Sequence, residues 1–350
     1  MISFNFVFLL LVFTSFLFLL ISVFLYLIIR KAMNNQFKRK VENYKNDYRI
    51  HVFHYLQNEE KEPIAHLTNK EEHIAVLELL SEYANVLDGE VIRKRLRDYV
   101  ADHFEEYIKK DLKSNRWSVR MNALYQIEDF NLNFMIEPLR NYYNDRRLTE
   151  EEESQLLKMF ALFQEEDLVH KLLNTKTNLS NFNIRSIFRK MDRETFSKFV
   201  ERFDELPKLY QLAVIDTVAS ERMLWYHLFL EHMLQSDDSE IQIRTLKAYA
   251  ETSLPLKEEE LEPFILMRRW QVKMMLAKII GAQRIERYKK LLKELLCDKE
   301  YIVRSEAAKA IMEFSDGIDI LTEVVQVSKD RFAKDMANEW LEKERSGDSY

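Results

Sequence analysis

The chain opens with an uninterrupted apolar pattern and then changes to a periodic one. Residues 3–29 contain no charged side chain, and a helix of that length measures about 40 Å. Because a bilayer core is about 30 Å thick, this segment is long enough to cross it with some tilt. The pattern therefore predicts a transmembrane anchor over residues 1–29 that contacts the lipid bilayer through residues 3–29.

The charges that flank this apolar run predict its orientation. Lys and Arg are retained on the cytoplasmic side of a membrane, so we expect a single-pass protein of the plasma or inner membrane with its N-terminus outside. A cleaved signal peptide is the competing interpretation, but it needs a basic start, a shorter apolar stretch and a small-residue cleavage site. No basic side chain precedes the run, whereas several follow it: Arg30, Lys31, Lys38, Arg39, Lys40 and Lys45.

Residues 30–62 change to a polar segment in which apolar residues return at steps of three and four. This spacing is typical of an amphipathic helix, here one that continues from the anchor. Pro63 then ends it, since proline breaks a helix interior. The apolar positions of this juxtamembrane helix are Phe37, Val41, Tyr44, Tyr48, Val52 and Leu56.

The remainder of the chain has the composition of an all-helical protein. It contains only 4 glycines and 5 prolines among 350 residues, too few for the many turns of a sheet protein. Two segments match a capping box, Thr68–Glu71 and Thr149–Glu152. The acidic run 150–153 resembles a metal site, but carboxylates also favour the first turn of a helix, which is the interpretation we prefer.

A repeat of about 30 residues is clearest in the second half of the chain, and earlier copies precede it. Each copy has a branched apolar residue, then a basic one, then small and apolar residues on one helical face. Weaker units fill the gaps around residues 152–163 and 209–219. The copies centre on Val119-Arg120, Ile184-Arg185, Ile243-Arg244, Val272-Lys273 and Val303-Arg304.

The segment DKEYIVRSEAAKAIMEF, residues 298–314, resembles the HEAT-repeat family, in particular its short bacterial repeats. The resemblance implies a right-handed α-solenoid of helix pairs over residues 63–328, closed by a capping helix and tail over residues 329–350. It also implies a ladder in which a turn Asp and an Arg six residues later link neighbouring repeats. The Val119, Ile184 and Val272 copies lack the Asp. The matching residues are Asp238, Arg244, Asp298 and Arg304.

The sequence carries no arrangement typical of catalysis or of a cofactor. Its glycines stand too far apart for a phosphate-binding loop, and its histidines form no ligand motif such as HExxH. Cys297 has no histidine near it in sequence that would activate a thiol. The net charge of −6 gives no general attraction to nucleic acid. We therefore expect no cofactor, no metal, no nucleic acid, no small-molecule substrate and no enzymatic activity.

Two places combine a tryptophan with basic residues at the predicted start of a repeat helix. Aromatic and Arg side chains are the usual anchors of protein-binding surfaces, and a basic aromatic groove suits an acidic peptide or loop. The alternative is that both tryptophans pack between repeats and that their basic neighbours are merely solvated. The candidate residues are Arg116, Trp117, Arg120, Arg268, Arg269, Trp270 and Lys273.

These patterns favour a membrane-tethered cytoplasmic scaffold that binds a protein partner at or in the membrane. Tethering raises the effective concentration of such a partner at the bilayer. A more specific version is an accessory subunit of an integral-membrane machine, such as a glycosyltransferase or a secretion complex. A helical lyase or hydrolase is the remaining alternative, and it would need a deep pocket that holds several titratable groups.

Overall fold

Within the described residues, the chain is entirely helical. The computed structural model describes residues 6–58, 67–87, 89–145 and 147–346, and these ranges contain 18 α-helices, four short 3-10 helices and no strand. This confirms the all-α class predicted from the scarcity of glycine and proline. The chain divides into two compact units, Met1–Arg147 and Leu148–Tyr350, a division that falls inside the predicted solenoid range. Each unit is described by itself.

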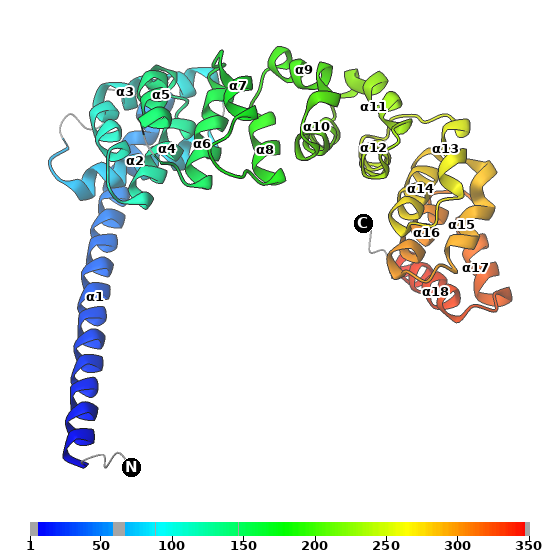
Figure 1. Ribbon diagram of the computed structural model, residues 1–350, viewed down its shortest axis with the longest axis horizontal. Coiled ribbons are helices and arrows are strands. Elements are labelled where there is room, and N and C mark those ends of the chain that lie inside the picture. Colours follow the sequence, from blue (N-terminus) through cyan, green and yellow to red (C-terminus); the bar gives the residue numbers. More distant parts are fainter. Residues whose placement is uncertain (1–5, 59–66, 88, 146, 347–350) are drawn as a thin grey trace. The chain divides into compact units, whose positions relative to one another are not determined.

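The first unit contains five α-helices and one 3-10 helix. In Figure 1 the N-terminal part of α1 extends away from the other helices of its unit as a free rod. The bounds are α1 Phe6–Asn58, α2 Lys70–Val86, α3 Glu90–Leu112, α4 Trp117–Asp129, η1 Asn133–Met135 and α5 Ile136–Asp145.

Helix α1 joins the apolar run and the juxtamembrane segment without a break. By length and composition it is the one helix of the described residues that is able to cross a membrane, and its apolar stretch touches no other part of the molecule. Residues 3–5 of the predicted anchor, and Pro63, lie outside the described residues.

The second half of α1 packs on α2 and α3 through the predicted apolar face. Of the six predicted apolar positions, Val41, Val52 and Leu56 are buried, and the other three, Phe37, Tyr44 and Tyr48, are half-buried. An ion pair supports the same face, because Lys45 Nζ lies 2.5 Å from the Glu82 carboxylate of α2. The apolar segment and the packed segment are therefore two halves of one continuous helix.

The capping predictions differ in outcome. The Thr149–Glu152 box is present, with the Glu152 amide donating to the Thr149 hydroxyl and the Glu152 carboxylate accepting from the Thr149 amide. The first box is displaced by one residue from its predicted position. Asn69 caps α2, and Glu72 rather than Glu71 closes the box, because the Asn69 side chain accepts from the Glu72 amide at 2.9 Å.

The described residues of the second unit, 148–346, form thirteen α-helices. The even-numbered ones carry the predicted repeat segments, and the odd-numbered ones connect them. The even-numbered helices are α6 Glu150–Leu162, α8 Asn181–Phe188, α10 Lys208–Ser220, α12 Ser239–Thr252, α14 Trp270–Gln283, α16 Tyr301–Met312 and α18 Arg331–Ser346. The others are α7 Leu168–Leu173, α9 Arg193–Glu201, η2 Phe203–Glu205, η3 Leu224–Tyr226, α11 His227–Leu234, α13 Glu258–Ile265, η4 Glu286–Tyr288, α15 Lys289–Leu295 and α17 Gly317–Val327.

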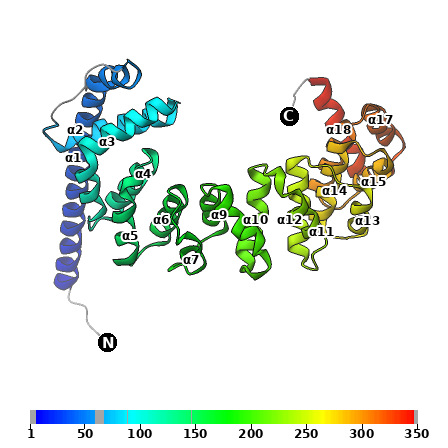
Figure 2. The ribbon, with the colours of Figure 1, turned by 90° about the horizontal axis from the view of Figure 1, so that it is seen from above.

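Each even-numbered helix of this unit packs against the next one along the chain, from α6 to α18. Figure 2 shows α10, α12 and α14 as successive neighbours. The recurring pattern of the sequence thus corresponds to a recurring helix contact. Of the predicted C-terminal segment, α18 packs on α16 and α17, while residues 347–350 lie outside the described residues.

Small side chains set the distance between α14 and α16. A Cβ atom added to Gly281 would lie 2.6 Å from the Ala310 Cα atom, so only glycine permits this approach. Ala307 and Ala308 are fully buried on the same helix as Ala310. Close contact of this kind buries apolar surface that a single helix pair leaves exposed.

We expect Ala307→Asp to lower the free energy of unfolding by several kcal/mol, because it buries an unpaired carboxylate. Ala282→Asp is the matched control, since Ala282 is exposed at the end of α14, and it should cost less than about 1 kcal/mol. Chemical denaturation of the detergent-solubilised chain, followed by circular dichroism, measures both. Equal effects would show that Ala307 is not in a packed contact in solution.

Candidate functional site

The two predicted binding clusters both lie at the beginning of a helix. Arg116 is the N-cap residue of α4 and Trp117 is its first residue, while Arg269 and Trp270 take the same positions on α14. The two clusters belong to different units of the chain. Each is therefore a separate candidate surface.

In the first cluster, the tryptophan faces solvent and one arginine turns inward. Trp117 is 45% exposed, which disfavours the interpretation that it is a packing residue between repeats. Arg120 is half-buried, and its Nε atom donates to the Tyr142 hydroxyl of α5 at 2.9 Å. Its Nη1 atom donates to the Ser114 carbonyl at 3.1 Å. Arg120 thus fixes α5 against α4, and Arg116 and Trp117 form the exposed part of the cluster.

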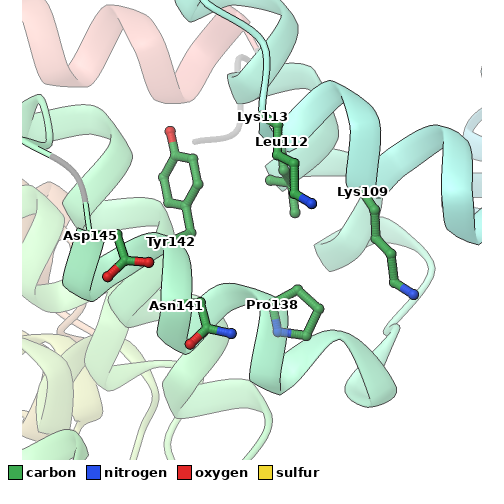
Figure 3. A pocket seen from close by; sticks show the side chains of 7 residues that line it. All are labelled: Lys109, Leu112, Lys113, Pro138, Asn141, Tyr142 and Asp145. Carbon is green, nitrogen blue, oxygen red and sulfur yellow. The ribbon is translucent and has the colours of Figure 1, made fainter.

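A cavity of about 260 Å³ lies beside Arg120, and sequence reasoning missed it. Lys109 at its rim is held within its own helix, because its Nζ atom lies 2.6 Å from the Glu105 carboxylate. Of the residues singled out in the sequence, Arg120 contacts this cavity's lining, because it donates to the Tyr142 hydroxyl. Figure 3 shows its lining residues, which are Lys109, Leu112, Lys113, Pro138, Asn141, Tyr142 and Asp145.

In the second cluster, Trp270 is 38% exposed and both arginines, Arg268 and Arg269, are exposed as well. The Arg269 Nη1 atom donates to the Ser239 hydroxyl of α12 at 2.8 Å. Lys273 was predicted as a third basic group beside this tryptophan. The structure instead places its Nζ atom 2.5 Å from the Asp298 carboxylate, so its charge is already compensated within the molecule.

Three of the four predicted ladder residues, Asp238, Arg244 and Asp298, form an ion pair with a neighbouring even-numbered helix. Asp238 caps α12 by accepting from the Glu240 amide at 2.8 Å, and it lies 2.6 Å from Lys208 Nζ of α10. Arg244 Nη1 lies 2.6 Å from the buried Asp216 carboxylate of α10.

The last copy of the repeat differs from the others. The Asp298 carboxylate accepts from the Glu300 amide at 3.0 Å and pairs with Lys273, whereas Arg304 bonds the backbone carbonyls of Asp298 and Lys299. Asp298 and Arg304 are therefore joined by a backbone bond rather than by an ion pair.

These contacts also show that the first turns of successive even-numbered helices lie side by side. Lys208 links the start of α10 to α12, Arg269 links α14 to α12, and Lys273 links α14 to the turn before α16. The Arg304 guanidinium reaches the Phe332 ring of α18 at 5.0 Å. We call the first turns of α14, α16 and α18 the arginine edge.

Among the described residues, no group of three or more His, Cys, Asp or Glu side chains is placed to hold a metal ion. Cys297 is exposed, and partial burial together with the Asp330 carboxylate raises the pKa of its thiol. A raised pKa keeps the thiol protonated at neutral pH, which is the opposite of what a nucleophile needs.

Comparison with known proteins gives no relative: no protein-family model matches the chain, and neither does any curated protein.

The Lys273–Asp298 ion pair predicts a pH dependence. Burial alone would raise the pKa of the Asp298 carboxyl, but the bonds from Lys273 and from the Glu300 amide outweigh it and lower the pKa below its ordinary value. A lowered folded-state pKa stabilises the protein above about pH 4, and this stability is lost as the pH falls through the folded-state value.

We therefore expect Asp298→Asn to reduce the free energy of unfolding at pH 7 by roughly 1 kcal/mol, because it breaks the ion pair but leaves the side chain polar. The difference from the wild-type chain should shrink as the pH falls from 5 to 3. Asp237→Asn, at an exposed neighbouring turn, is the control. A pH-independent difference would show that the charge of Asp298 is not involved.

Proposed function

We propose that this protein is a membrane-tethered cytoplasmic scaffold that binds a protein partner through a HEAT-like solenoid. The observation that carries the proposal is the continuity of α1, whose first half is apolar and exposed and whose second half is built into the first unit. A flexible linker between anchor and packed unit would leave the distance of that unit from the bilayer undefined. A shared helix instead fixes the packed unit close to the bilayer.

The height of this unit above the membrane follows from the helix. Ile29 is the last residue of the apolar run, and Val41 is the first fully buried residue of α1. At a rise of about 1.5 Å per residue, these positions lie about 18 Å apart. A partner that is itself an integral membrane protein suits this arrangement, because its cytoplasmic loops lie at the same height.

The charge on the intervening turns supports the proposed orientation. Arg30, Lys31, Lys38, Arg39 and Lys40 are all exposed on α1. Each basic group near an anionic leaflet contributes about 1 kcal/mol of attraction, and such groups are retained on the cytoplasmic side.

The helix contacts of the second unit support the solenoid. Successive even-numbered helices lie against one another, begin about 30 residues apart and place their first turns side by side, as stacked repeats do. The exposure of Trp270 beside Arg268 and Arg269 supports partner binding at the arginine edge, because an exposed tryptophan beside arginines is typical of a binding hot spot.

The topology is tested by reporter fusions. A periplasmic or extracellular reporter, active only outside the membrane, should be silent when fused after Tyr350, because the basic residues of α1 hold the C-terminal side in the cytoplasm. The same reporter fused before Met1 should be active. The reverse pattern, or release of the soluble part by signal peptidase, would contradict the proposal.

Partner binding is tested by crosslinking in membranes and quantitative mass spectrometry. Trp270→Ala and Arg269→Ala should each reduce recovery of the same partner about thirtyfold at unchanged melting temperature, the loss that truncating a hot-spot residue causes. Phe182→Ala removes another exposed aromatic side chain of the second unit, one on α8, and is the control. Lost stability with Trp270→Ala, combined with normal recovery with Arg269→Ala, would reduce this cluster to a packing role.

A further inference from the structure

Arg304 of α16 is an almost fully buried guanidinium with incomplete hydrogen bonding. Only 8% of the residue is exposed. Its Nη1 atom donates to the carbonyls of Asp298 at 2.8 Å and Lys299 at 3.0 Å, whereas its Nε atom is buried and has no hydrogen-bond partner. A buried donor without an acceptor is destabilising, so its persistence requires an explanation.

The charge of Arg304 also lacks the counterion that the equivalent arginine has. Arg244 lies 2.6 Å from the Asp216 carboxylate. Within the described part of the chain, no carboxylate lies within 4.0 Å of the Arg304 guanidinium. The carboxylates at the turns before α16 and α18 are otherwise engaged: Asp298 pairs with Lys273, and Asp330 caps α18 by accepting from the Ala333 amide at 2.9 Å.

Two aromatic rings stand beside this cation and face solvent. The Arg304 Cζ atom lies 5.9 Å from the centre of the Tyr301 ring and 5.0 Å from that of Phe332. The exposed fractions of Tyr301 and Phe332 are 58% and 63%, and Ile302 beside them is also exposed. Cation–π contacts offset part of the energetic cost of the missing counterion. They leave the outer faces of the two rings exposed to water.

We propose that Arg304, Tyr301 and Phe332 form a pocket for a carboxylate-bearing peptide segment of the partner, in which an apolar side chain follows or precedes the acidic one. A carboxylate would supply the missing counterion and accept from the guanidinium, while its apolar neighbour would cover the two rings. The first turns of α16 and α18 favour an anion at the same place.

This inference rests on the proposed function and names the chemistry of the partner. The Lys273–Asp298 pair joins the first turns of α14 and α16, so the pocket continues the arginine edge from Trp270 toward α18. It also assigns a role to an arginine that the sequence identified only as part of a structural ladder.

The test is a selection of random dodecapeptides displayed on phage against the purified full chain in nanodiscs of neutral lipid. We expect the selected peptides to be enriched in Asp or Glu next to Leu, Ile or an aromatic residue. The best peptide, labelled with fluorescein, should bind at least thirtyfold more weakly to Arg304→Gln and to Phe332→Ala in fluorescence anisotropy, as hot-spot truncations do.

Phe182→Ala provides the matched control, because Phe182 is 73% exposed at the second position of α8, as Phe332 is on α18, and should leave peptide affinity unchanged. If Arg304→Gln fails to fold, the peptide affinities of Tyr301→Ala and Phe332→Ala, which change exposed side chains, test the pocket. Selected peptides without acidic enrichment, or peptides that bind Phe332→Ala and Tyr301→Ala normally, would overturn the pocket.

Two further outcomes separate this inference from the proposed function. Suppose that no peptide is selected, and that the full chain in neutral nanodiscs binds vesicles of anionic lipid but Arg304→Gln does not. This result would assign the pocket to a lipid headgroup and overturn the peptide proposal. Partner recovery that depends on Trp270 but not on Arg304 would keep the scaffold function and refute the pocket.

Discussion

The structure depends on one constraint, which is that each even-numbered helix of the second unit needs its neighbours to cover its apolar face. The contact between α14 and α16 meets this constraint most tightly, because Gly281 leaves room for Ala310 and Ala307 is wholly covered. Any larger side chain would hold the helices apart and expose the apolar surface that stabilises them. The scarcity of bulky residues at these positions is therefore as informative as the hydrophobic periodicity.

Most of the secondary structure follows from local rules in the sequence. The helices around Ile243, Val272 and Val303 lie where the repeat predicted them, since their apolar face recurs with the helical period. The continuation of the anchor through residue 58 follows for the same reason. The capping box is displaced by one residue because Thr and Asn are both favoured N-cap residues, and a local pattern does not decide between two adjacent ones. In the structure Asn69 accepts from the Glu72 amide, whereas the Thr68 hydroxyl donates to the Glu72 carboxylate.

The candidate site was less predictable, because side-chain partners depend on contacts between distant segments. Nothing in the sequence around Arg120 indicates that it bonds Tyr142, or around Lys273 that it pairs with Asp298. The repeat identified Arg244 and Arg304 as equivalent residues, yet the structure gives only Arg244 a counterion. Similar local sequence thus produces different electrostatic environments, since the compensating carboxylate comes from the preceding repeat.

This difference divides the basic residues of the second unit into two kinds: those whose charge is compensated by a neighbouring helix, and those that are candidates for binding a partner. Lys208, Lys273 and Arg244 each meet an acidic residue of a neighbouring helix, so their charges are compensated within the fold. Ion pairs of this kind fix the register of one helix against the next, and removing one partner leaves the other uncompensated. Arg304 has the same place in the repeat but meets two exposed aromatic rings instead of a carboxylate. The start of α16 is therefore a place in the second unit where the ladder of charges between helices is incomplete, and we propose that a carboxylate of a partner completes it there.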